Sequence, residues 1–450
     1  MFAEPETLNS QRRTRNPKPE TRNPEPETRN FMATVLPFKA LRPTNDKVHL
    51  VASRSVDGYS VSDLKDKLSG NPYTFLHVIN PDFDDGQRTR PGSKERLAKV
   101  KKKFKSFIKE KIFKRDEKPA YYIYRQVKNG DEYIGIIACT SIDDYMNGVI
   151  KIHEQTITQR EEKLKDYLEV CEFNAEPVLF CYPNDATLDK LIADISESFP
   201  DYDFTTTDKI RHTLWVVNDE KKVQLISKRF SSIPAIYIAD GHHRSASSAL
   251  LGNLKRNAKK NYSGKEAFNY YLGIFFAETQ LKIYDYNRLV KDLNNITVPE
   301  LLQRLKQKFE VKALDVEIFK PGAKHQLSMY VDNKWYSLVS KEGTYNSNDP
   351  IGSLDAYILT EHILSPIFGI HDLKTDKRIG FVPGVKGAEA LKRSVDEGKA
   401  EVAFGLYPVT MEQLKWIADT NHIMPPKSTW VEPKMRSGLV IYSFEEENQD

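Results

Sequence analysis

Five consecutive residues of the types that bind anions and move protons stand where a predicted strand becomes a predicted helix. The segment is YIADGHHRSASSA, and the five residues are Asp240, Gly241, His242, His243 and Arg244. The first peptide N–H groups of a helix have no partner within the helix and lie at the positive end of its dipole. The turn is therefore typical of an anion site, most naturally a phosphate site.

The residue types in this turn permit distinct roles. Gly241 allows a tight bend and close approach of a ligand. Arg244 offers a planar fork to phosphate oxygens, and the two histidines and Ser245 offer further donors. Asp240 can hold Mg²⁺ or accept a proton from an attacking hydroxyl group. A helix cap would explain Asp240 alone, but not the polar and flexible residues that follow it.

A second candidate cluster is the HEQT segment, where His153 and Glu154 stand between an apolar strand and a predicted helix. It is not a zincin motif, because the position of the second histidine holds Ile157. An acid beside a histidine at an element boundary is a candidate base or metal ligand. A capping acid next to a surface histidine explains the pattern equally well.

The third candidate is the MPPKST segment near the C-terminus, in which Lys427, Ser428 and Thr429 follow two prolines. The prolines stiffen the approach, and one cation with two hydroxyl groups suits phosphate. An ordinary loop is the alternative. The chain has no G-x-x-x-x-G-K-[ST] and no G-x-G-x-x-G motif, so phosphate binding needs another architecture.

Strands and helices alternate irregularly after Met32, which predicts an α+β fold with a mixed sheet. Residues 120–127 and 133–140 flank an Asn-Gly turn, so we expect a hairpin. Apolar residues recur at helical spacing over residues 94–114, and residues 160–173 predict another amphipathic helix. The lysines of the first helix could bind anions, but a solvated helix face explains them better.

The chain divides into three predicted parts. In residues 1–31 a Pro-rich heptad, NPKPETR then NPEPETR, cannot bury a core, so this part is expected to be disordered. It reads most simply as translated upstream sequence, with Met32 the native start. Residues 32–298 are expected to form the phosphate-binding core, and residues 299–450 an α/β region that supplies the MPPKST loop. The last fifty residues could fold back onto the first part.

Composition limits the function classes. A formal net charge of +4 over 450 residues is too weak to argue for nucleic acid. The apolar runs are less than half the ~20 residues that a membrane helix needs. Three widely spaced cysteines, Cys139, Cys171 and Cys181, indicate thiols in a reducing compartment. We therefore expect a cytoplasmic protein.

The chain resembles the domain-of-unknown-function family 1015 (DUF1015) from about residue 36 to residue 444. The motifs that carry the resemblance are NPYTFLHV (71–78), HEQT (153–156), RHTLW (211–215), DGHHR (240–244) and MPPKSTW (424–430). The family is similar to the ParB/sulfiredoxin superfamily, whose free L-serine kinases make O-phosphoserine. The resemblance implies a ParB/sulfiredoxin-like core, Mg²⁺ as cofactor, a donor that is ATP, ADP or pyrophosphate, and a small hydroxylated acceptor such as serine.

The resemblance also implies roles for individual residues. Asp240 would act in catalysis or bind Mg²⁺, with Glu154, beside His153, as the general base or second acid. Residues 241–244 would bind the donor phosphates, and residues 427–429 would contact the transferred group or the acceptor. Two departures, VASRSVDGYS (51–60) and Asn287 in YDYNRLV, bear on the acceptor more than on phosphate binding.

Three functions compete at this stage. The first is a small-molecule kinase, most simply of free serine. The second is a regulator that binds a nucleotide or phosphometabolite without turnover. The third is a phosphohydrolase with water as acceptor. Binding to DNA is disfavoured, because no helix-turn-helix pattern joins a basic face. The sequence does not indicate the oligomeric state.

Overall fold

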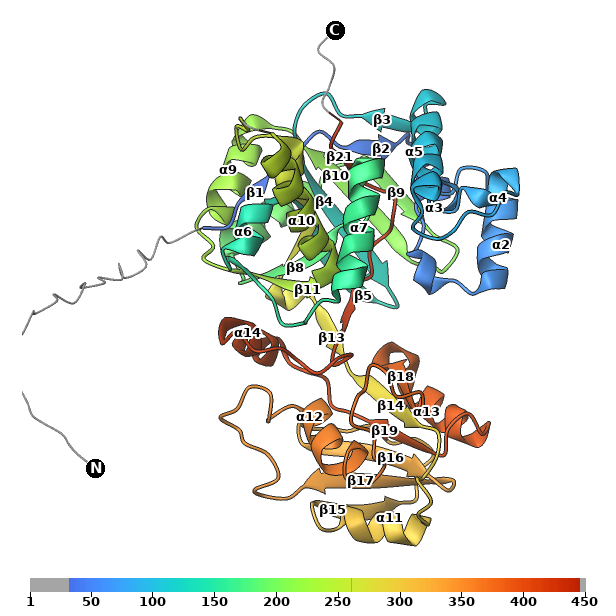
Figure 1. The fold of residues 1–450 in the computed structure, drawn as a ribbon. Coiled ribbons are helices and arrows are strands. Elements are labelled where there is room, and N and C mark those ends of the chain that lie inside the picture. The colour runs from blue at the N-terminus through green and yellow to red at the C-terminus, as the bar shows by residue number, and fades with distance from the viewer. Residues whose placement is uncertain (1–31, 260, 446–450) are drawn as a thin grey trace, which may run out of the picture. The chain divides into compact units, whose positions relative to one another are not determined.

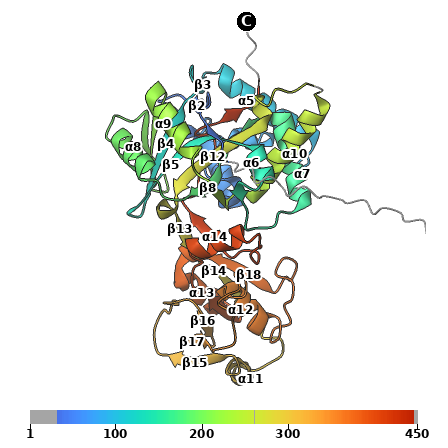
Figure 2. The same cartoon turned by 90° about the vertical axis from the view of Figure 1, so that its left-hand side faces the viewer.

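The structure is a computed structural model, and it describes residues 32–259 and 261–445. The predicted disordered extension, residues 1–31, lies outside these residues, so it stays a prediction. These described residues group into one compact unit that contains two large β-sheets. Figures 1 and 2 show the sheets and their helices in two perpendicular views.

The first sheet is mixed, with nine strands in the order β6-β11-β8-β12-β5-β4-β10-β9 and β1 added on β5. Two pairs are parallel, β11 with β6 and β12 with β8, and the other pairs are antiparallel. The strands are β1 Val35–Leu36, β4 Tyr121–Lys128, β5 Asp131–Ser141, β6 Ile150–Lys151, β8 Val178–Tyr182, β9 Tyr202–Thr205, β10 Arg211–Val217, β11 Ile236–Asp240 and β12 Tyr270–Ala277. The predicted hairpin is confirmed as β4 and β5, with Asn129 and Gly130 at positive φ in the turn.

Side chains alternate between the two faces of this sheet, as the pleat requires. In β4, Tyr121 and Ile123 belong to a core covered by helices, whereas Tyr122 and Tyr124 pack on the other face. The helices over the first face are α6 Ile142–Met146, α8 Ala186–Ser196, α9 Glu220–Phe230 and α10 His242–Ala258. Segments from both ends of the described chain, 38–48 and 431–444, cover the second face.

A further group of helices packs beside α10 and forms a core of its own. Its members are α1 Val48–Val51, α2 Val61–Gly70, α3 Leu76–Ile79, α4 Asp82–Asp85, α5 Lys94–Lys109 and α7 Thr158–Cys171. Helix α7 lies between α10 and α5, as Figure 1 shows. The prediction placed helix α5 over residues 94–114, but α5 ends at Lys109 because Lys111 has a positive φ and β3 (Phe113–Arg115) follows.

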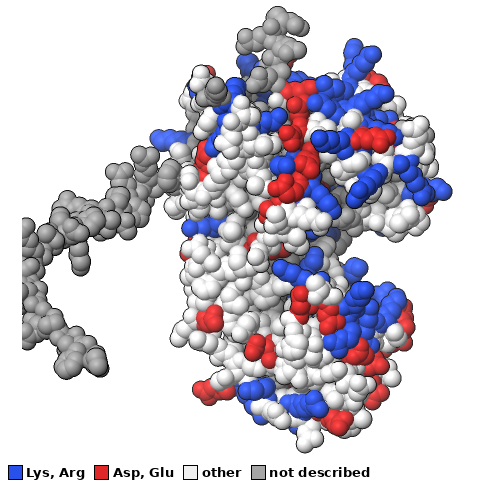
Figure 3. All heavy atoms as spheres, viewed as in Figure 1, with Lys and Arg blue, Asp and Glu red and all other residues white. Residues whose placement is uncertain are grey.

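Several lysines of α5 are paired with acidic side chains. Lys103 contacts Asp84 at 2.6 Å and Lys105 contacts Glu445 at 2.6 Å. On the face drawn in Figure 3, Lys and Arg side chains are interspersed with Asp and Glu side chains. This arrangement agrees with the expected solvated helix face.

The second sheet is antiparallel, with six strands in the order β15-β17-β16-β19-β14-β18. Its strands are β14 Tyr286–Val290, β15 Phe309–Leu314, β16 Gln326–Val331, β17 Lys334–Ser340, β18 Ile379–Pro383 and β19 Val402–Gly405. Its helices are α11 Val298–Leu305, α12 Asp355–Leu359, continued by a π-helical turn over Thr360–Leu364, and α13 Gly387–Asp396. Strand β14 of this sheet lies before residue 298. The domain boundary expected at residue 298 stays a prediction.

The C-terminal segment returns to the first part of the chain. Helix α14 (Met411–Asp419) precedes β20 (Trp430–Glu432), which pairs with β13 (Lys282–Tyr284), and β21 (Tyr442–Ser443) pairs with β7 (Phe173–Asn174). Backbone bonds in both directions join Ile441 to Leu41, next to the ladder of β2 (Leu41–Pro43) and β3. The predicted fold-back is observed, and it brings residues 424–437 to the first sheet.

The fold is α+β, as predicted. Cys139, Cys171 and Cys181 are all buried and free. Among the helices of the described residues, none is long and apolar enough to cross a lipid bilayer.

Candidate functional site

A cavity of about 540 Å³ brings the three candidate motifs together. Ten of the predicted site residues line it: His153, Glu154, Asp240, Gly241, His242, His243, Arg244, Lys427, Ser428 and Thr429. They come from the ends of β6 and β11, the start of α10 and the loop after α14. Segments more than 180 residues apart in the sequence thus face one space.

Ser245 is the exception among the predicted phosphate-binding residues. Its side chain is completely buried, and Ser245 does not line the cavity. It lies on the side of α10 that faces the sheet, near Tyr271. Ser247 and Ser248 line the cavity instead, with their hydroxyl groups donating to the carbonyl of Arg244.

The turn between β11 and α10 has the geometry that the sequence predicts. Strand β11 ends at Asp240, Gly241 has φ +106°, and α10 begins at His242 with no side-chain cap. A Cβ atom at Gly241 would lie 2.8 Å from two nitrogens of the Arg244 guanidinium group. The backbone angle therefore favours glycine here, and a larger residue would displace the Arg244 guanidinium group from its place over the turn.

Asp240 lies among cations. Its Oδ2 atom is 3.4 Å from Lys434 Nζ and 3.5 Å from Arg244 Nη2. Partial withdrawal from solvent raises the pKa of Asp240, but Lys434, Arg244 and Lys427 outweigh that and hold the pKa below its usual value. Asp240 is consequently a carboxylate that lies among three cationic side chains.

Glu154 differs from Asp240, although both line the same cavity. Partial burial and the neighbouring Asp240 charge raise the pKa of Glu154, and Lys427 opposes them. Two carboxyl groups with pKa values shifted in opposite directions are typical of sites that move protons. Asp240 and Glu154 thus differ in pKa although they line the same cavity.

The three histidines are held neutral. Burial lowers the pKa of His153 to about 4 and the pKa of His242 well below its usual value. The Nε2 atom of His242 accepts from the backbone N–H of His153 at 3.4 Å, so Nδ1 carries the proton and points at Glu154, 3.6 Å away. His243 Nε2 accepts from the N–H of Ile157 at 3.0 Å, and burial lowers the pKa of His243 too.

The MPPKST loop is tied to the HEQT segment, because the N–H of Met424 donates to the carbonyl of His153 at 2.9 Å. Ser428 donates a hydrogen bond to the carbonyl of Pro425 at 2.7 Å, so its hydroxyl proton is used within the loop. Lys427 has φ +57°, and its ammonium group lies 5.5 Å from the ring centre of Tyr286. This backbone places the Lys427 side chain at the cavity.

Arg288 stabilises the MPPKST loop. It is completely buried, and its guanidinium group donates to the carbonyls of Tyr286 and Pro426 and lies 4.7 Å from the ring centre of Phe381. No ion pair is found for it among the described residues, and burial lowers its pKa to about 9. Arg288 thus joins strand β14 to the residue before Lys427.

Sequence reasoning missed several residues of the site. The cavity is also lined by Arg160, Glu176, Tyr286, Trp430 and Lys434. Lys434 Nζ lies 4.5 Å from the ring centre of Trp430, and Arg244 Nη1 lies 3.2 Å from Glu176 Oε2. The Pro-Lys pair at 433–434, a short distance after MPPKST, is the one signal that could have indicated Lys434. Glu176 stands in a segment that the sequence predicts to be a buried strand.

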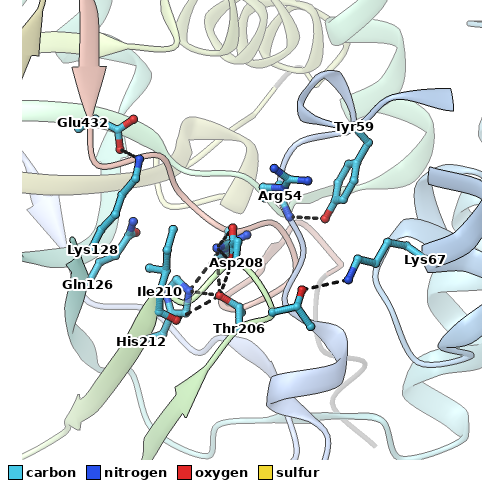
Figure 4. Close-up of polar contacts among 12 residues, drawn as sticks. Arg54, Tyr59, Lys67, Gln126, Lys128, Thr206, Asp208, Ile210, His212 and Glu432 are labelled. Carbon is cyan, nitrogen blue, oxygen red and sulfur yellow. Dashed lines mark hydrogen bonds and ion pairs between the residues drawn. The ribbon is translucent and has the colours of Figure 1, made fainter. Parts of the chain in front are cut away.

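The RHTLW motif contacts the segment that carries Lys434 through His212, which Figure 4 shows beside Thr206 and Asp208. Arg436 donates to both carboxylate oxygens of Asp208 at 2.8 Å, and its Nε atom is 3.3 Å from His212 Nε2. His212 is completely buried and also contacts the hydroxyl groups of Tyr124 and Thr206. Arg211 and His212 therefore lie outside the cavity, and the motif has a structural role.

The acidic residues of the site match Mg²⁺ bound together with a ligand better than a metal site made by protein alone. No group of three or more His, Cys, Asp or Glu residues able to hold a metal occurs among residues 32–259 and 261–445. Mg²⁺ is usually bound through one or two carboxylates plus substrate phosphates. Asp240 fits that requirement, with Glu154 on the same cavity.

Comparison with known proteins defines the family. Residues 35–357, most of the chain, match the model of the family described as protein of unknown function (DUF1015). The chain belongs to this family. A search of curated proteins finds no match.

Solved structures give distant similarities. A mutant free serine kinase in complex with AMP aligns with a TM-score of 0.34 at 14% identity, covering 66% of this chain and 88% of that chain. A second mutant free serine kinase, in complex with ADP, gives a TM-score of 0.33 at 14% identity, with the same coverage. SbnI with a C-terminal truncation, from Staphylococcus aureus, gives 0.35 at 12%, covering 66% and 82%. At such values, these similarities carry no conclusion about ligand or reaction.

Proposed function

We propose that this protein is a small-molecule phosphotransferase, most simply a free L-serine kinase that makes O-phosphoserine from ATP, ADP or pyrophosphate. The observation that carries the proposal is the convergence of Arg244, Lys427 and Lys434 with the start of α10 around one cavity that also holds Glu154. A ParB/sulfiredoxin-like core and a cytoplasmic location belong to the same proposal.

Phosphoryl transfer needs positioning and neutralisation of charge more than covalent chemistry. The peptide N–H groups of His242 and His243, in the first turn of α10, would donate hydrogen bonds to phosphate oxygens of the phosphoryl donor. Arg244 and the two lysines would balance the negative charge that spreads over the transferred group. These groups are fixed before the ligand arrives, since Lys434 stacks on Trp430 and Lys427 on Tyr286.

Glu154 would be the general base. The acceptor hydroxyl oxygen forms a bond to phosphorus, the bond from phosphorus to the leaving phosphate oxygen breaks, and the hydroxyl proton passes to Glu154. Its raised pKa brings it closer to the operating pH, which favours proton transfer in both directions. The Nδ1–H group of neutral His242 would orient the carboxylate.

Mg²⁺ is part of the proposal, with Asp240 as its protein ligand. When bound, the ion would neutralise phosphate charge and polarise the phosphorus–oxygen bond. Asp240 stays ionised because of Lys434 and Arg244, which keeps an oxygen ligand available.

A donor and acceptor screen by phosphorus NMR tests this proposal. ATP, ADP or pyrophosphate is incubated with Mg²⁺ and a panel of hydroxylated amino acids, and O-phosphoserine is the expected new signal. Asp240→Asn and Glu154→Gln should each lower its rate at least a hundredfold with unchanged melting temperature. Release of inorganic phosphate without serine would indicate a phosphohydrolase, and binding without turnover would indicate a regulator; either result contradicts the kinase.

A further inference from the structure

The same cavity is also lined by apolar side chains of two helices, Phe75 and Ile79 from α3 and its N-terminus and Leu164, Tyr167 and Leu168 from α7. No step of the proposed transfer uses this wall.

The charged and apolar parts are joined by direct contacts. Arg244 pairs with Glu176 at 3.2 Å, and Glu176 accepts a hydrogen bond from Ser437 at 3.1 Å. The next residue, Gly438, has φ +78°, and a Cβ atom there would lie 2.6 Å from the Phe75 ring. The aromatic wall thus begins one residue beyond the network that holds Arg244.

The wall is continuous from one helix to the other. The Phe75 and Tyr167 rings both pack on the buried ring of Phe173, with centroid distances of 6.3 Å and 5.7 Å. Leu164 precedes Tyr167 by one helical turn on α7, and Ile79 follows Phe75 by one turn. The two helices therefore present one apolar surface to the cavity.

One polar side chain of the cavity limits the class of ligand that this surface suits. Asn174 lines the cavity, and its Oδ1 atom accepts from the N–H of Leu272 at 3.2 Å, so its amide N–H groups are the part that can serve a ligand. A flat ring with apolar faces and a polar edge suits such surroundings better than an unbranched acyl chain does. Pyrophosphate and serine have no apolar surface. With only these two ligands bound, the apolar side chains would stay in contact with water.

We propose that the ligand of this cavity is an organic phosphate whose second part is a ring-sized apolar group held between α3 and α7. This inference rests on the proposed function for its phosphate end. The ring can come from the base of a nucleotide or from an aromatic group on another phosphoester. Both share the chemistry of a ring joined to phosphate.

Two matched pairs of probes test the proposal by calorimetric titration of the full chain. ADP is compared with pyrophosphate, and phenyl phosphate with inorganic phosphate, since the members of each pair differ chiefly in the ring-bearing group. In at least one pair, the ring-bearing member should bind at least tenfold more tightly. A gain for ADP alone identifies a nucleobase as the ring, and a gain for phenyl phosphate identifies an aromatic group in general.

Substitutions in α3 and α7 test whether any gain in affinity for the ring-bearing probe comes from their apolar side chains. Leu164→Gln on α7 and Ile79→Gln on α3 should each remove most of the gain while leaving affinity for pyrophosphate unchanged. Leu254→Gln is the matched control, because Leu254 is an exposed residue of α10 that does not line the cavity. If one wall variant fails to fold, the other carries the test.

The outcomes separate this inference from the proposed function. Equal affinities within both pairs, or a gain that both wall variants retain, would overturn the apolar subsite and leave phosphate binding intact. Failure of all four probes to bind would overturn the phosphate site and the subsite together.

Discussion

At the scale of single residues, the candidate site depends on one glycine whose backbone angle and missing side chain are both used. Gly241 lets β11 turn directly into α10, and it leaves room for the Arg244 guanidinium group. The left-handed region costs roughly 1–2 kcal/mol for other residues. Replacement of Gly241 should therefore lower ligand affinity more than replacement of another glycine with a positive φ.

Gly241→Ala is predicted to lower the affinity for pyrophosphate at least tenfold, about 1.4 kcal/mol, because the new methyl group displaces Arg244. Gly130→Ala is the matched control, since Gly130 also has a positive φ but lies in a hairpin turn with open space around it. Calorimetric titration and thermal melting of both variants give the comparison. Equal losses of affinity would show that backbone strain alone is responsible.

Arg288 is a positioning residue in this account, because it reaches the cavity only through the loop that carries Lys427. Arg288→Met is predicted to weaken pyrophosphate binding several-fold. The double variant with Lys427→Met should bind no worse than Lys427→Met alone, within about 0.5 kcal/mol. Arg256→Met, which removes a pair with Asp143 far from the cavity, is the control. Additive losses for Arg288 and Lys427 would contradict the positioning role.

At the scale of elements, the returning C-terminal segment completes the site. The contacts of Arg436 with Asp208 and His212 fix the segment that carries Lys434. This segment lies almost 200 residues after the DGHHR turn, so its position depends on the tertiary fold.

Arg436→Met should cost about 1–3 kcal/mol of unfolding free energy, since it removes hydrogen bonds to a charged group. It should also weaken pyrophosphate binding through Lys434. Arg211→Met is the matched comparison, because the Arg211–Asp203 pair is exposed and is expected to be worth less than about 1 kcal/mol. Denaturant unfolding measures both. Similar costs for the two variants would argue against the structural role of Arg436.

The sequence was sufficient for local features and for the residue types of the site. The hairpin of β4 and β5, helix α7 and the strand-to-helix turn at Gly241 follow from periodicity and turn chemistry, which are local. Lys434, Glu176 and Tyr286 were missed because their role depends on which segments pack together. Ser245 was misplaced because the direction of a side chain in the first turn of α10 depends on how the helix sits on the sheet.

At the scale of the whole molecule, buried neutral histidines couple stability to pH. His212 is the clearest case, since burial and then Arg436 lower its pKa, Asp208 opposes them, and the resulting pKa is about 3. The unfolded chain takes up a proton below its ordinary pKa of about 6.5, while the folded protein does not. Stability from this group is thus present above pH 6.5 and is lost as the pH falls toward 3.

His212→Gln is predicted to reduce the dependence of the unfolding free energy on pH by up to about 1.4 kcal/mol per pH unit between pH 6 and pH 4. The slope is the quantity to compare, because the substitution also changes stability at every pH. Denaturant unfolding at several pH values measures it. An unchanged slope would mean that His212 is protonated in the folded protein.

The central claim is that the start of α10 and the cations around Asp240 bind one phosphate group. A crystal structure of the protein soaked with pyrophosphate tests this directly. We predict an anion within hydrogen-bond distance of the peptide N–H groups of His242 and His243 and of the Arg244 guanidinium group. Pyrophosphate bound elsewhere, or no density in this cavity at saturating concentration, would contradict the claim.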